Sequence, residues 1–535
     1  MATADCTPIT VAPGASRLFQ DFCSGTSAAC AFYPIATGKD IWFQSSLQSS
    51  HIDSLVAELG AQNTGEPAKS GLEILRAGGG AVVTGQQVGL FGGPLYTPLK
   101  AATALARARQ ATAAGRAHAA IFWLATEDHD FAEINHVTFP GKRELATLKY
   151  GHSPAVPVPV GGVVIDQSIS QLIDQAWELL GYSDAMEALA AAYKPGRTFA
   201  QAFAEFYSKA FAAQGLLVID PSTRGFHALG APVLRAAIER ADELHASLLE
   251  RNEALVAAGY HAQVAVGPQS SLLFLLDATT GARVALKRQP PTAEEPDGIW
   301  MAGRDRYSTA DLLQILAAEP ERISPSALLR PVFQDFLLGN SLTIGGPAEV
   351  AYFAQSAVLY EKILGRMTPV EPRLSATLIE PAIAELLRTH ELTLERVIAE
   401  TPDSLAQLLA ARAMPIEGKR LLSAAGNALD AELDPLLAWM RSVDEGLGRS
   451  GETSARKMRY QMGRLRRMAA NFQLKKEESL RRHADAICQA LFPHSTAQER
   501  VHGAAFYFAR HGFELAEQLT EKAAEPCPGH TLIWL

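Results

Sequence analysis

The sequence predicts an α/β protein with a parallel β-sheet core, followed by a helical coiled coil. Two apolar, β-branched segments, 81–84 and 342–344, each run into a glycine-rich turn and then a helical pattern. Apolar residues spaced by three, four or seven positions after residue 420 predict the coiled coil. These patterns indicate an α/β core with its helical part placed last.

The first junction begins with the strand 81–84 and continues into a loop from Gly85 to Gly93. Pro94 suits the first turn of a helix, which the alanine-rich segment 100–114 continues. Residues 121–124 (Ile-Phe-Trp-Leu) predict the next buried strand. The order strand–loop–helix–strand is a βαβ unit, the building block of a Rossmann-like parallel sheet.

Later segments have the same character. Residues 215–220 predict a third core strand, and 342–344 enters the glycines of a second strand–helix junction, with its helix at 348–364. Residues 261–276 alternate enough to predict strands, with 283–287 as a hairpin partner. The proline- and acid-rich stretch 289–297 predicts a loop.

A chain of 535 residues is too long for a single hydrophobic core. We expect the following order: the first part of the Rossmann-like core at 1–150, a helical insertion at 151–214, core strands at 215–275, a connecting insertion at 276–323, the last part of the core at 324–384, a helical coiled-coil domain at 385–505, and a C-terminal segment at 506–535 that packs back on the core.

Two long helices with apolar seams and a short connection predict an antiparallel hairpin. We expect the connection at 449–454 and a stutter in the second seam between Phe472 and Leu480. The seam positions are Leu422, Leu429, Leu433, Leu436, Met440, Val443 and Leu447 in the first helix, and Met458, Met462, Leu465, Ala469 and Phe472 in the second.

The second helix is strongly basic. Residues 456–482 contain ten Lys or Arg and two Glu, whereas the first helix carries several acidic residues. We interpret these charges as mutual pairing plus a solvated face. An RNA-binding arm is the alternative, although Tyr460 and Phe472 are the only aromatic residues there for base stacking.

The bulk composition excludes several classes of protein. A net charge of −9 argues against a general nucleic-acid or membrane-surface role. The five cysteines have no C-x-x-C spacing, so we expect free thiols in a reducing cytoplasm rather than a disulfide framework or a zinc ribbon. The sequence has no signal-peptide pattern and no apolar run of membrane-spanning length.

The first candidate site is the glycine loop, where glycines let a ligand approach the backbone and amides at a helix start attract anions. It matches neither a Walker A loop nor a dinucleotide fingerprint, and a purely structural turn is the alternative. The candidate residues in and after this loop are Gly85, Gln86, Gln87, Gly89, Phe91, Gly92, Gly93, Tyr96, Thr97 and Lys100.

The second candidate site directly follows the strand 121–124, where ligands of open α/β sheets bind. Its four carboxylates and two imidazoles within ten residues repel unless a cationic substrate, a metal or shared protons compensate. We prefer amine binding or general-base work and assign no metal, with a solvated acidic loop as the alternative. The candidates are Glu127, Asp128, His129, Asp130, Asn135 and His136.

The third candidate site combines Arg330 with the second glycine junction. Arg330 lies between an apolar run and a proline, and such an arginine is either a buried ion pair or a fork for a carboxylate or phosphate. The further candidates are Gly345, Gly346, Glu349 and Tyr352 at the junction, and Arg373.

Long motifs across the chain resemble one family, the cysteine-adding enzymes (cysteine ligases) of bacillithiol biosynthesis. The matching segments are TGQQVGLFGGPLYTPLK at 84–100, FWLATEDHDFAEINHV at 122–137, SPSALLRPVFQD at 324–335, GGPAEVAYFAQ at 345–355, EPRLSATLIE at 371–380 and QERV at 498–501. The resemblance extends over nearly the whole chain, and it is less distinct in the first 30 residues and at 151–214.

The resemblance implies a Rossmann-like core with connecting-peptide insertions and a coiled coil that forms a homodimer. It also implies a cytoplasmic ligase that joins the carboxyl of cysteine to the amine of glucosaminyl malate, with ATP as the expected co-substrate. In that reaction the glycine-loop amides and Lys100 would hold an anionic group, and Arg330 would hold a carboxylate. Asp128, His129 or Asp130 would deprotonate the amine, and Gln86, Gln87 and Asn135 would bind sugar hydroxyls.

Two other classes remain as alternatives. One is an ATP-dependent ligase or nucleotidyltransferase acting on another small substrate. The other is a non-catalytic coiled-coil scaffold or RNA-binding protein, although an acidic cluster beside a glycine loop is unexpected in an inactive shell.

Overall fold

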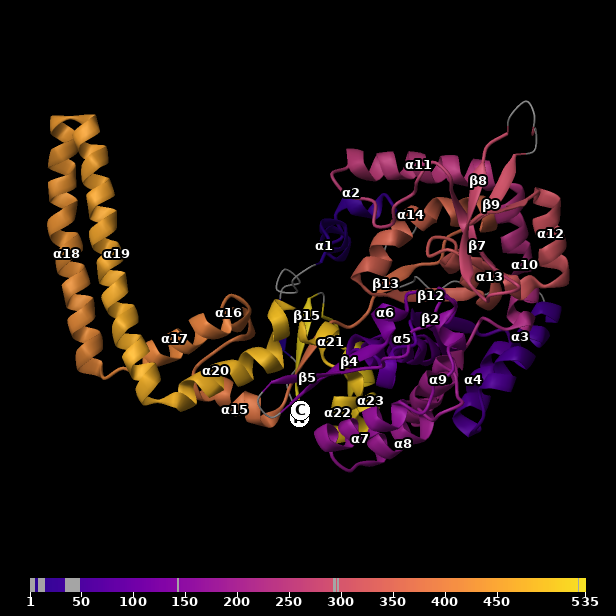
Figure 1. The fold of residues 1–535 in the computed structure, drawn as a ribbon, viewed down its shortest axis with the longest axis horizontal. Helices are drawn as coiled ribbons and strands as arrows, with labels where there is room; N and C mark the ends of the chain where they lie inside the picture. The colour runs from indigo at the N-terminus through magenta and orange to yellow at the C-terminus, as the bar shows by residue number, and fades with distance from the viewer. Residues whose placement is uncertain are drawn as a thin grey trace. The chain divides into compact units, whose positions relative to one another are not determined.

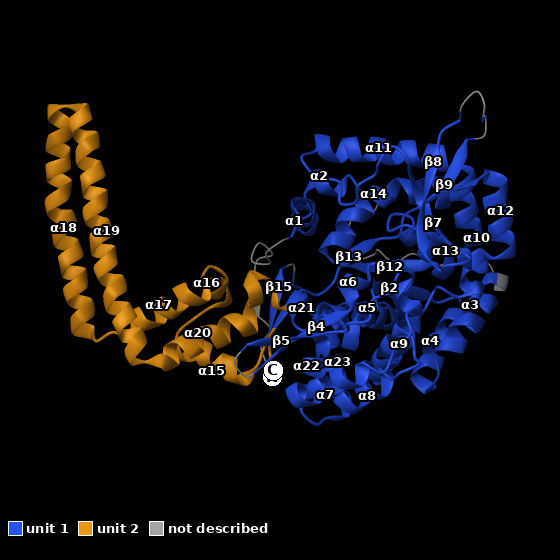
Figure 2. Cartoon of the chain, viewed as in Figure 1, with its two compact units in different colours: residues 1, 3–377, 499–533 blue, residues 2, 378–498, 534–535 orange. Residues whose placement is uncertain are grey.

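The computed structural model describes residues 5–7, 15–33, 49–141, 144–291, 295, 298–527 and 529–535. The described chain divides into two compact units (Figure 2). The first unit contains 3–377 and 499–533, and the second contains 378–498 with the last two residues. No helix among the described residues has the length and apolarity needed to cross a membrane.

The centre of the first unit is a parallel sheet with the strand order β13-β12-β2-β3-β6 (Figure 1). Thr84 of β2 lies between Ile344 of β12 and Phe122 of β3, so the carboxyl ends of these three strands meet at one edge. The Rossmann-like prediction is confirmed. The strands are β2 (Gly80–Gln86), β3 (His118–Leu124), β6 (Leu217–Ile219), β12 (Asn340–Gly345) and β13 (Val370–Pro372).

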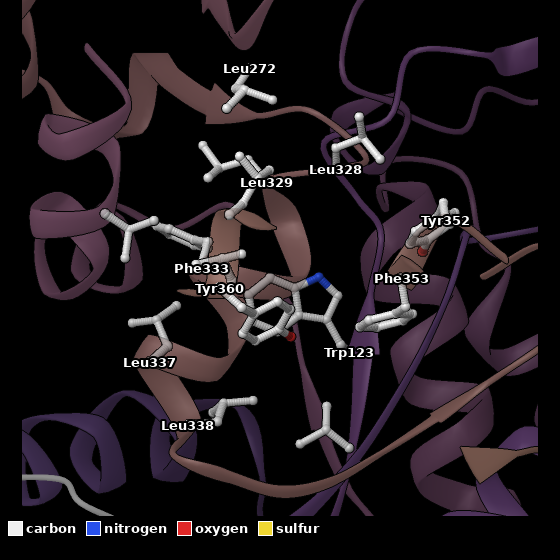
Figure 3. Packing of buried hydrophobic residues seen from close by; sticks show 14 of the residues in the cluster. Trp123, Leu272, Leu328, Leu329, Phe333, Leu337, Leu338, Tyr352, Phe353 and Tyr360 are labelled. Atoms are coloured by element: carbon white, nitrogen blue, oxygen red, sulfur yellow. The ribbon is translucent and has the colours of Figure 1, made fainter. Parts of the chain in front are cut away.

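The strands form where apolar β-branched residues are completely buried, and helices cover both faces of the sheet. On one face Trp123 of β3 packs edge-on against Phe333 of α13 (Arg330–Leu338), with ring centroids 6.3 Å apart. Figure 3 shows this cluster, to which α14 (Pro347–Leu364) adds Phe353. The other face packs against α5 (Tyr96–Ala113), where small alanines allow close contact.

A second, antiparallel sheet has the order β10-β9-β8-β7-β11 and lies in the same unit. The predicted hairpin at 283–287 is confirmed as β8, but the predicted strand begins at Ser270 rather than His261. Most of the predicted loop 289–297 lies outside the described residues. The strands are β7 (Ser270–Leu276), β8 (Arg283–Gln289), β9 (Ile299–Ala302), β10 (Asp305–Tyr307) and β11 (Ile323–Pro325).

Tyrosines from the segment 151–214 buttress the glycine loop. Tyr193 donates a hydrogen bond from its hydroxyl to the Gly89 carbonyl at 2.8 Å, and Tyr207 does the same to Gly92 at 2.8 Å. Both tyrosines are fully buried, so the loop is fixed by its own supports rather than left open. The segment contains α7 (Ile169–Leu180), α8 (Asp184–Ala192) and α9 (Phe199–Ala210).

The last part of the first unit runs along the glycine loop and α5. The Leu95 amide donates to the His502 carbonyl at 2.7 Å, and the Ala504 amide donates to Gly93 at 2.9 Å. Further along, Arg109 of α5 forms an ion pair with Glu517. These contacts place residues 499–504 beside the loop. The elements here are α21 (Gln498–Val501), α22 (Ala504–His511) and α23 (Glu514–Ala524).

The remaining elements complete the first unit and its boundary. They are α1 (Arg17–Cys23), α2 (Ser27–Cys30), α3 (Ser49–Gln62), α4 (Glu66–Arg76), α6 (Phe131–Ile134), α10 (Arg224–Glu239), α11 (Ala241–Ala257), α12 (Thr309–Ala318), the hairpin of β4 (His136–Pro140) with β5 (Leu145–Lys149), and a small sheet of β1 (Asp5–Thr7), β15 (His530–Trp534) and β14 (Ala376–Ile379).

The expectation of five free thiols is wrong for Cys6 and Cys527, which form a disulfide. The two residues are 521 positions apart, and they meet because β1 pairs antiparallel with β15. No local spacing could reveal a pair that depends on the chain ends meeting. Cys23, Cys30 and Cys488 are free. Burial raises the pKa of Cys23 to about 12 and that of Cys488 to about 11, so both thiols stay protonated at neutral pH.

The second unit contains the predicted antiparallel hairpin, formed by α18 (Ile416–Val443) and α19 (Glu445–Lys476). The turn is at Asp444, so the predicted connection at 449–454 is wrong. Gly448 and Gly451 resemble loop residues in the sequence but serve helix packing instead: a Cβ on Gly451 would lie 2.8 Å from the Met440 sulfur. The other helices are α15 (Pro381–Thr389), α16 (Leu394–Ile398), α17 (Pro402–Ala413) and α20 (Glu478–Leu491).

The apolar seam of the hairpin differs from the prediction. Leu433 and Leu437 bury against Ala455, whereas the predicted seam residues Leu436 and Val443 are exposed. The predicted stutter is a break, because α19 ends at Lys476 and α20 begins at Glu478. The predicted charge pairing is confirmed at Arg459, which contacts Asp430 at 2.7 Å and Asp434 at 3.0 Å.

Candidate functional site

A cavity of about 430 Å³ opens at the carboxyl ends of β2, β3 and β12. The antiparallel sheet contributes Phe274, Arg283 and Pro325 to its wall. Most of the predicted site residues meet here. Those that line it are Gly85, Gln86, Gln87, Tyr96, Lys100, Glu127, Asp128, His129, Arg330, Gly346, Glu349, Tyr352 and Arg373.

A second cavity of about 360 Å³ adjoins the first, because the two share wall residues. The predicted residues Gly89, Gly93 and His136 line it. The shared residues are Gln86, Gln87, Tyr96, Glu133 and Arg500. The arrangement is therefore a main cavity, between the two sheets, and a side cavity, beside the glycine loop.

Lys100 is buried at the base of the main cavity, with 4% of its surface exposed. Its ammonium forms an ion pair with Glu349, and it donates to the Gly85 carbonyl at 2.7 Å and to Gln86 Oε1 at 2.9 Å. Burial alone would raise the pKa of Glu349, but Lys100 and Arg330 outweigh it and hold that pKa below its usual value. Lys100 thus links the first glycine junction, through Gly85, to the second, through its ion pair with Glu349.

Arg330 reaches the same region from the start of α13. Its guanidinium donates to the Tyr352 hydroxyl and lies 4.0 Å from Glu349 Oε1. An arginine has five N–H donors, so these contacts leave further donors for a ligand. Protein groups therefore hold Arg330 in place, and some of its N–H donors stay available to a ligand.

Arg373 is held from behind by a buried carboxylate. It forms a bidentate pair with Glu499, at 2.8 Å and 2.6 Å, and its guanidinium carbon lies 5.5 Å from the centre of the Tyr96 ring. Glu499 also accepts the Ala376 amide at 3.0 Å. The pair with Glu499 uses both terminal nitrogens of Arg373, whereas its buried Nε has no hydrogen-bond partner among the described residues.

Asp128 faces the main cavity as an ionised carboxylate. It accepts hydrogen bonds from Gln87 Nε2 at 2.6 Å and from the His129 amide at 2.8 Å. Burial alone would raise the pKa of Asp128, but these hydrogen bonds and the Arg283 charge together lower it. The side chain is fixed in position and keeps its negative charge at neutral pH.

His129 adjoins Arg283, whose Nη1 lies 3.3 Å from Nδ1 of the imidazole. Arginine can only donate, so this contact makes Nδ1 the acceptor and leaves the proton on Nε2. This tautomer presents Nε2–H as a donor. Arg283 itself is held by Ser324 Oγ at 3.0 Å and the Pro325 carbonyl at 2.9 Å, and it stacks 3.7 Å above Phe274.

Glu127 is backed by a histidine that the sequence analysis did not single out. Nε2 of His227, in α10, lies 2.8 Å from Glu127 Oε1, and His227 is 0% exposed. Burial lowers the pKa of His227, but the charge of Glu127 outweighs this, so the pKa is raised overall. Glu127 therefore lines the main cavity next to Asp128, and the buried His227 supports it.

Three amides of the glycine loop already have partners within the protein, so they do not support its predicted role in binding an anion. The amides of Gly89, Gly92 and Gly93 donate to the Gln87 carbonyl, the Tyr193 hydroxyl and the Leu90 carbonyl, each at 3.0 Å. Those donors are used inside the loop, and the Lys100 donors are used as well. The loop instead shapes the wall between the two cavities.

Several predicted residues line neither cavity. Asp130 is exposed, and its carboxylate caps α6 by accepting the Glu133 amide at 3.2 Å. Thr97 and Asn135 are buried in the supporting layer, so a direct contact of Asn135 with sugar is not available in this structure. Phe91, Gly92 and Gly345 likewise support the wall from behind.

Sequence reasoning missed Arg283 and Arg500 as site residues. Arg283 lies in a strand of alternating pattern, where nothing marks it as different from a surface residue. Arg500 lies in the QERV segment, where the sequence gives no sign that one side chain faces a cavity. Among the described residues, no group of three or more His, Cys, Asp or Glu side chains is arranged to hold a metal ion.

The Glu127–His227 pair has a testable pH dependence. Because the folded-state pKa of His227 lies above the ordinary 6.5, the pair stabilises the fold below that value and loses this contribution as the pH rises through the raised pKa. A His227→Gln variant should lose about 3 kcal/mol of unfolding free energy near pH 6, and the deficit should shrink in alkaline solution. Urea denaturation at several pH values measures this, and a pH-independent deficit would contradict the charged pair.

The parallel-sheet core and this charged cavity define a Rossmann-like protein with room for a small polar molecule. Residues 4–374 match the family described as "Bacillithiol biosynthesis BshC, N-terminal Rossmann-like domain", and 376–535 match "Bacillithiol biosynthesis BshC, C-terminal coiled-coil domain". The chain therefore belongs to the BshC family of bacillithiol biosynthesis, which confirms the resemblance seen in the motifs.

Curated relatives agree over their whole lengths. A protein of Koribacter versatilis (strain Ellin345) is 39% identical over 542 residues, covering 99% of each chain. Relatives from Solibacter usitatus (strain Ellin6076) and Salinibacter ruber (strain DSM 13855 / M31) are 32% and 31% identical, covering 97% and 96% of this chain and 98% and 96% of their own. All three carry the name "Putative cysteine ligase BshC".

Proposed function

We propose that this protein joins the carboxyl group of cysteine to the amine of glucosaminyl malate, forming the amide bond of bacillithiol with ATP as the driving co-substrate. The observation that carries the proposal is the main cavity, where Asp128 and Glu127 face Arg283 and Arg330. Such a mixed set of charges suits a cationic amine next to anionic groups. The names of the family and its curated relatives support the same reaction.

Asp128 is the group we assign to the attacking amine. It is ionised and fixed by Gln87, so it binds the amine, which attacks in its neutral form, and accepts the proton that the nitrogen loses as the amide forms. Glu127, held by His227, provides a second negative charge beside it. We do not assign this role to Asp130, because it is exposed, caps α6 and lines neither cavity.

The cationic side of the cavity stabilises the negative charge that develops on the cysteine carbonyl oxygen. We assign this role to Arg283 and to the Nε2–H of His129, which Arg283 holds in the donor tautomer. Arg330 serves a phosphate or carboxylate group, because it has donors to spare beyond Tyr352.

The reaction needs an activating co-substrate, since forming an amide from a free carboxylate is uphill in water, and we propose ATP for this role. One phosphorus–oxygen bond of ATP breaks as the cysteine carboxylate oxygen bonds to phosphorus. The amine then displaces the phosphorylated oxygen, and its proton passes to Asp128. The nucleotide product identifies the route: AMP with pyrophosphate indicates an adenylate, and ADP indicates an acyl phosphate.

The test is reconstitution. The purified chain is incubated with cysteine, glucosaminyl malate and ATP, with each omitted in turn, and thiol product and nucleotides are followed by mass spectrometry. The proposal expects bacillithiol only when all three are present. An amide product with another amine would indicate a ligase of different substrate, and no thiol product under any condition would refute the proposal.

We further propose that the chain acts as a homodimer through the α18–α19 hairpin. Large apolar side chains on this hairpin are exposed, with Trp439 at 60% and Phe472 at 71%. A second copy would cover them. Light scattering should give twice the chain mass, and Trp439→Glu with Phe472→Glu should give the single-chain mass. Val256→Glu, at an exposed apolar residue of α11 in the first unit, is the control, and a monomeric wild type would contradict the assignment.

A further inference from the structure

Arg500 differs from the other cations of the main cavity. Lys100 is paired with Glu349, Arg373 with Glu499, and Arg330 with the Tyr352 hydroxyl, whereas Arg283 is held by Ser324 and a carbonyl. Among the described residues, the Arg500 side chain has no hydrogen-bond or ion-pair partner, although its charge lowers the pKa of Tyr96, which burial raises overall. A guanidinium that faces a cavity without an anion is available to a ligand.

The backbone around Arg500 is held on both sides. Its neighbour Glu499 is buried and bound by Arg373 and the Ala376 amide. After it, the His502 carbonyl accepts from Leu95, and the Gly503 amide donates to the Thr138 carbonyl at 2.7 Å. The backbone of Arg500 is therefore held at the cavity, whereas its side chain is exposed and free to turn toward a ligand.

Arg500 lies where the main and side cavities meet. It lines both, together with Gln86, Gln87, Tyr96 and Glu133. Asp128 lines the main cavity and not the side cavity. The site therefore has a negatively charged end for an amine and a junction with a free cation, which suits an elongated ligand with an amine at one end and an acid at the other.

We infer that Arg500 binds a carboxylate of the acidic arm of the substrate at the mouth of the side cavity, while the amine of the same molecule lies at Asp128. This inference rests on the proposed function, in which that arm is the malate group. A guanidinium and a carboxylate match geometrically as a two-hydrogen-bond pair, so one arginine accounts for selective binding of the arm.

Glu133 lies at the same junction as Arg500 and carries the opposite charge. Its carboxylate accepts from Gln87 Nε2 at 2.9 Å. A ligand carboxylate at Arg500 is repelled by this charge, so Glu133→Gln should tighten binding while Arg500→Gln weakens it. If the junction served a cation instead, the two effects would be reversed.

The experiment measures dissociation constants by isothermal titration for glucosaminyl malate and for methyl glucosaminide, which has the amine but no acid. Arg500→Gln should raise the dissociation constant for glucosaminyl malate about 10- to 100-fold, the range for a lost charge-assisted pair. The dissociation constant for methyl glucosaminide should not change. Arg500→Lys should recover part of the affinity. Arg76→Gln, at an exposed arginine that ends α4 and lines neither cavity, is the matched control.

The inference is overturned if Arg500→Gln binds glucosaminyl malate as wild type does, if it weakens both ligands equally, or if wild type binds neither. Because Arg500 has no partner among the described residues, its variants should unfold at the wild-type denaturant concentration, which separates binding from folding. If binding depends on Arg500 but no thiol product forms, the proposed function fails and the inference stands. If product forms and Arg500→Gln keeps the wild-type KM for glucosaminyl malate, the proposed function stands and the inference about Arg500 fails.

Discussion

A Lys100→Met variant is expected to lose both stability and activity. Methionine leaves Glu349 buried without its ion-pair partner, and breaking a buried pair costs about 3–5 kcal/mol. It also releases the Gly85 carbonyl and Gln86, which form part of the cavity wall. We expect the rate of bacillithiol formation to fall at least about 1000-fold, since the wall that positions the substrate is lost.

Its control is the double variant Lys100→Met, Glu349→Leu. Replacing both charges by apolar groups of similar size removes the unpaired charge, so most of the unfolding free energy should return. Activity should remain low. Urea denaturation and mass spectrometry of the product measure the two properties separately. A single variant as stable as wild type would show that the Lys100–Glu349 pair does not stabilise the fold.

An Asp128→Asn variant is expected to lose activity with little change in stability. The amide keeps the shape of the side chain and an oxygen that accepts from the His129 backbone, but it cannot take the proton of the amine. The loss of a general base typically costs about 100- to 10,000-fold in kcat. The KM for cysteine should be unchanged, because Asp128 is assigned to the other substrate.

The neighbouring Asp130→Asn is the matched control for Asp128. It makes the same chemical change two positions away, at an exposed helix cap. It should keep wild-type kcat, since asparagine also caps helices well. Equal losses in the two variants would show that the segment acts through its folding rather than through Asp128. Wild-type kcat in Asp128→Asn would remove Asp128 from the reaction.

The sequence predicted most of the core because its signals are local. The strands at 81–84, 121–124 and 342–344 are apolar and β-branched, and the glycine turns that follow them mark the sheet edge where ligands bind. The common direction of these strands brings Lys100, Asp128 and Glu349 to one cavity, as the sequence predicted. Their roles in binding or catalysis stay predictions.

The failures concern relations between distant segments. The Cys6–Cys527 disulfide depends on β1 meeting β15, and the support of Glu127 by His227 depends on how α10 packs. Gly448 and Gly451 have the composition of a turn, yet they lie in α19 because the neighbouring helix needs their small size. Arg500 was missed because its significance lies in having no partner, which only the packed structure reveals.

The most direct test of the account is a crystal structure of the protein with glucosaminyl malate bound. We predict that the ligand occupies the main cavity, with its amine nitrogen about 3 Å from an Asp128 oxygen and a malate carboxylate against Arg500. A ligand bound outside this cavity, or bound in it with the amine directed away from Asp128, would contradict the assignment of this cavity as the site of amide formation.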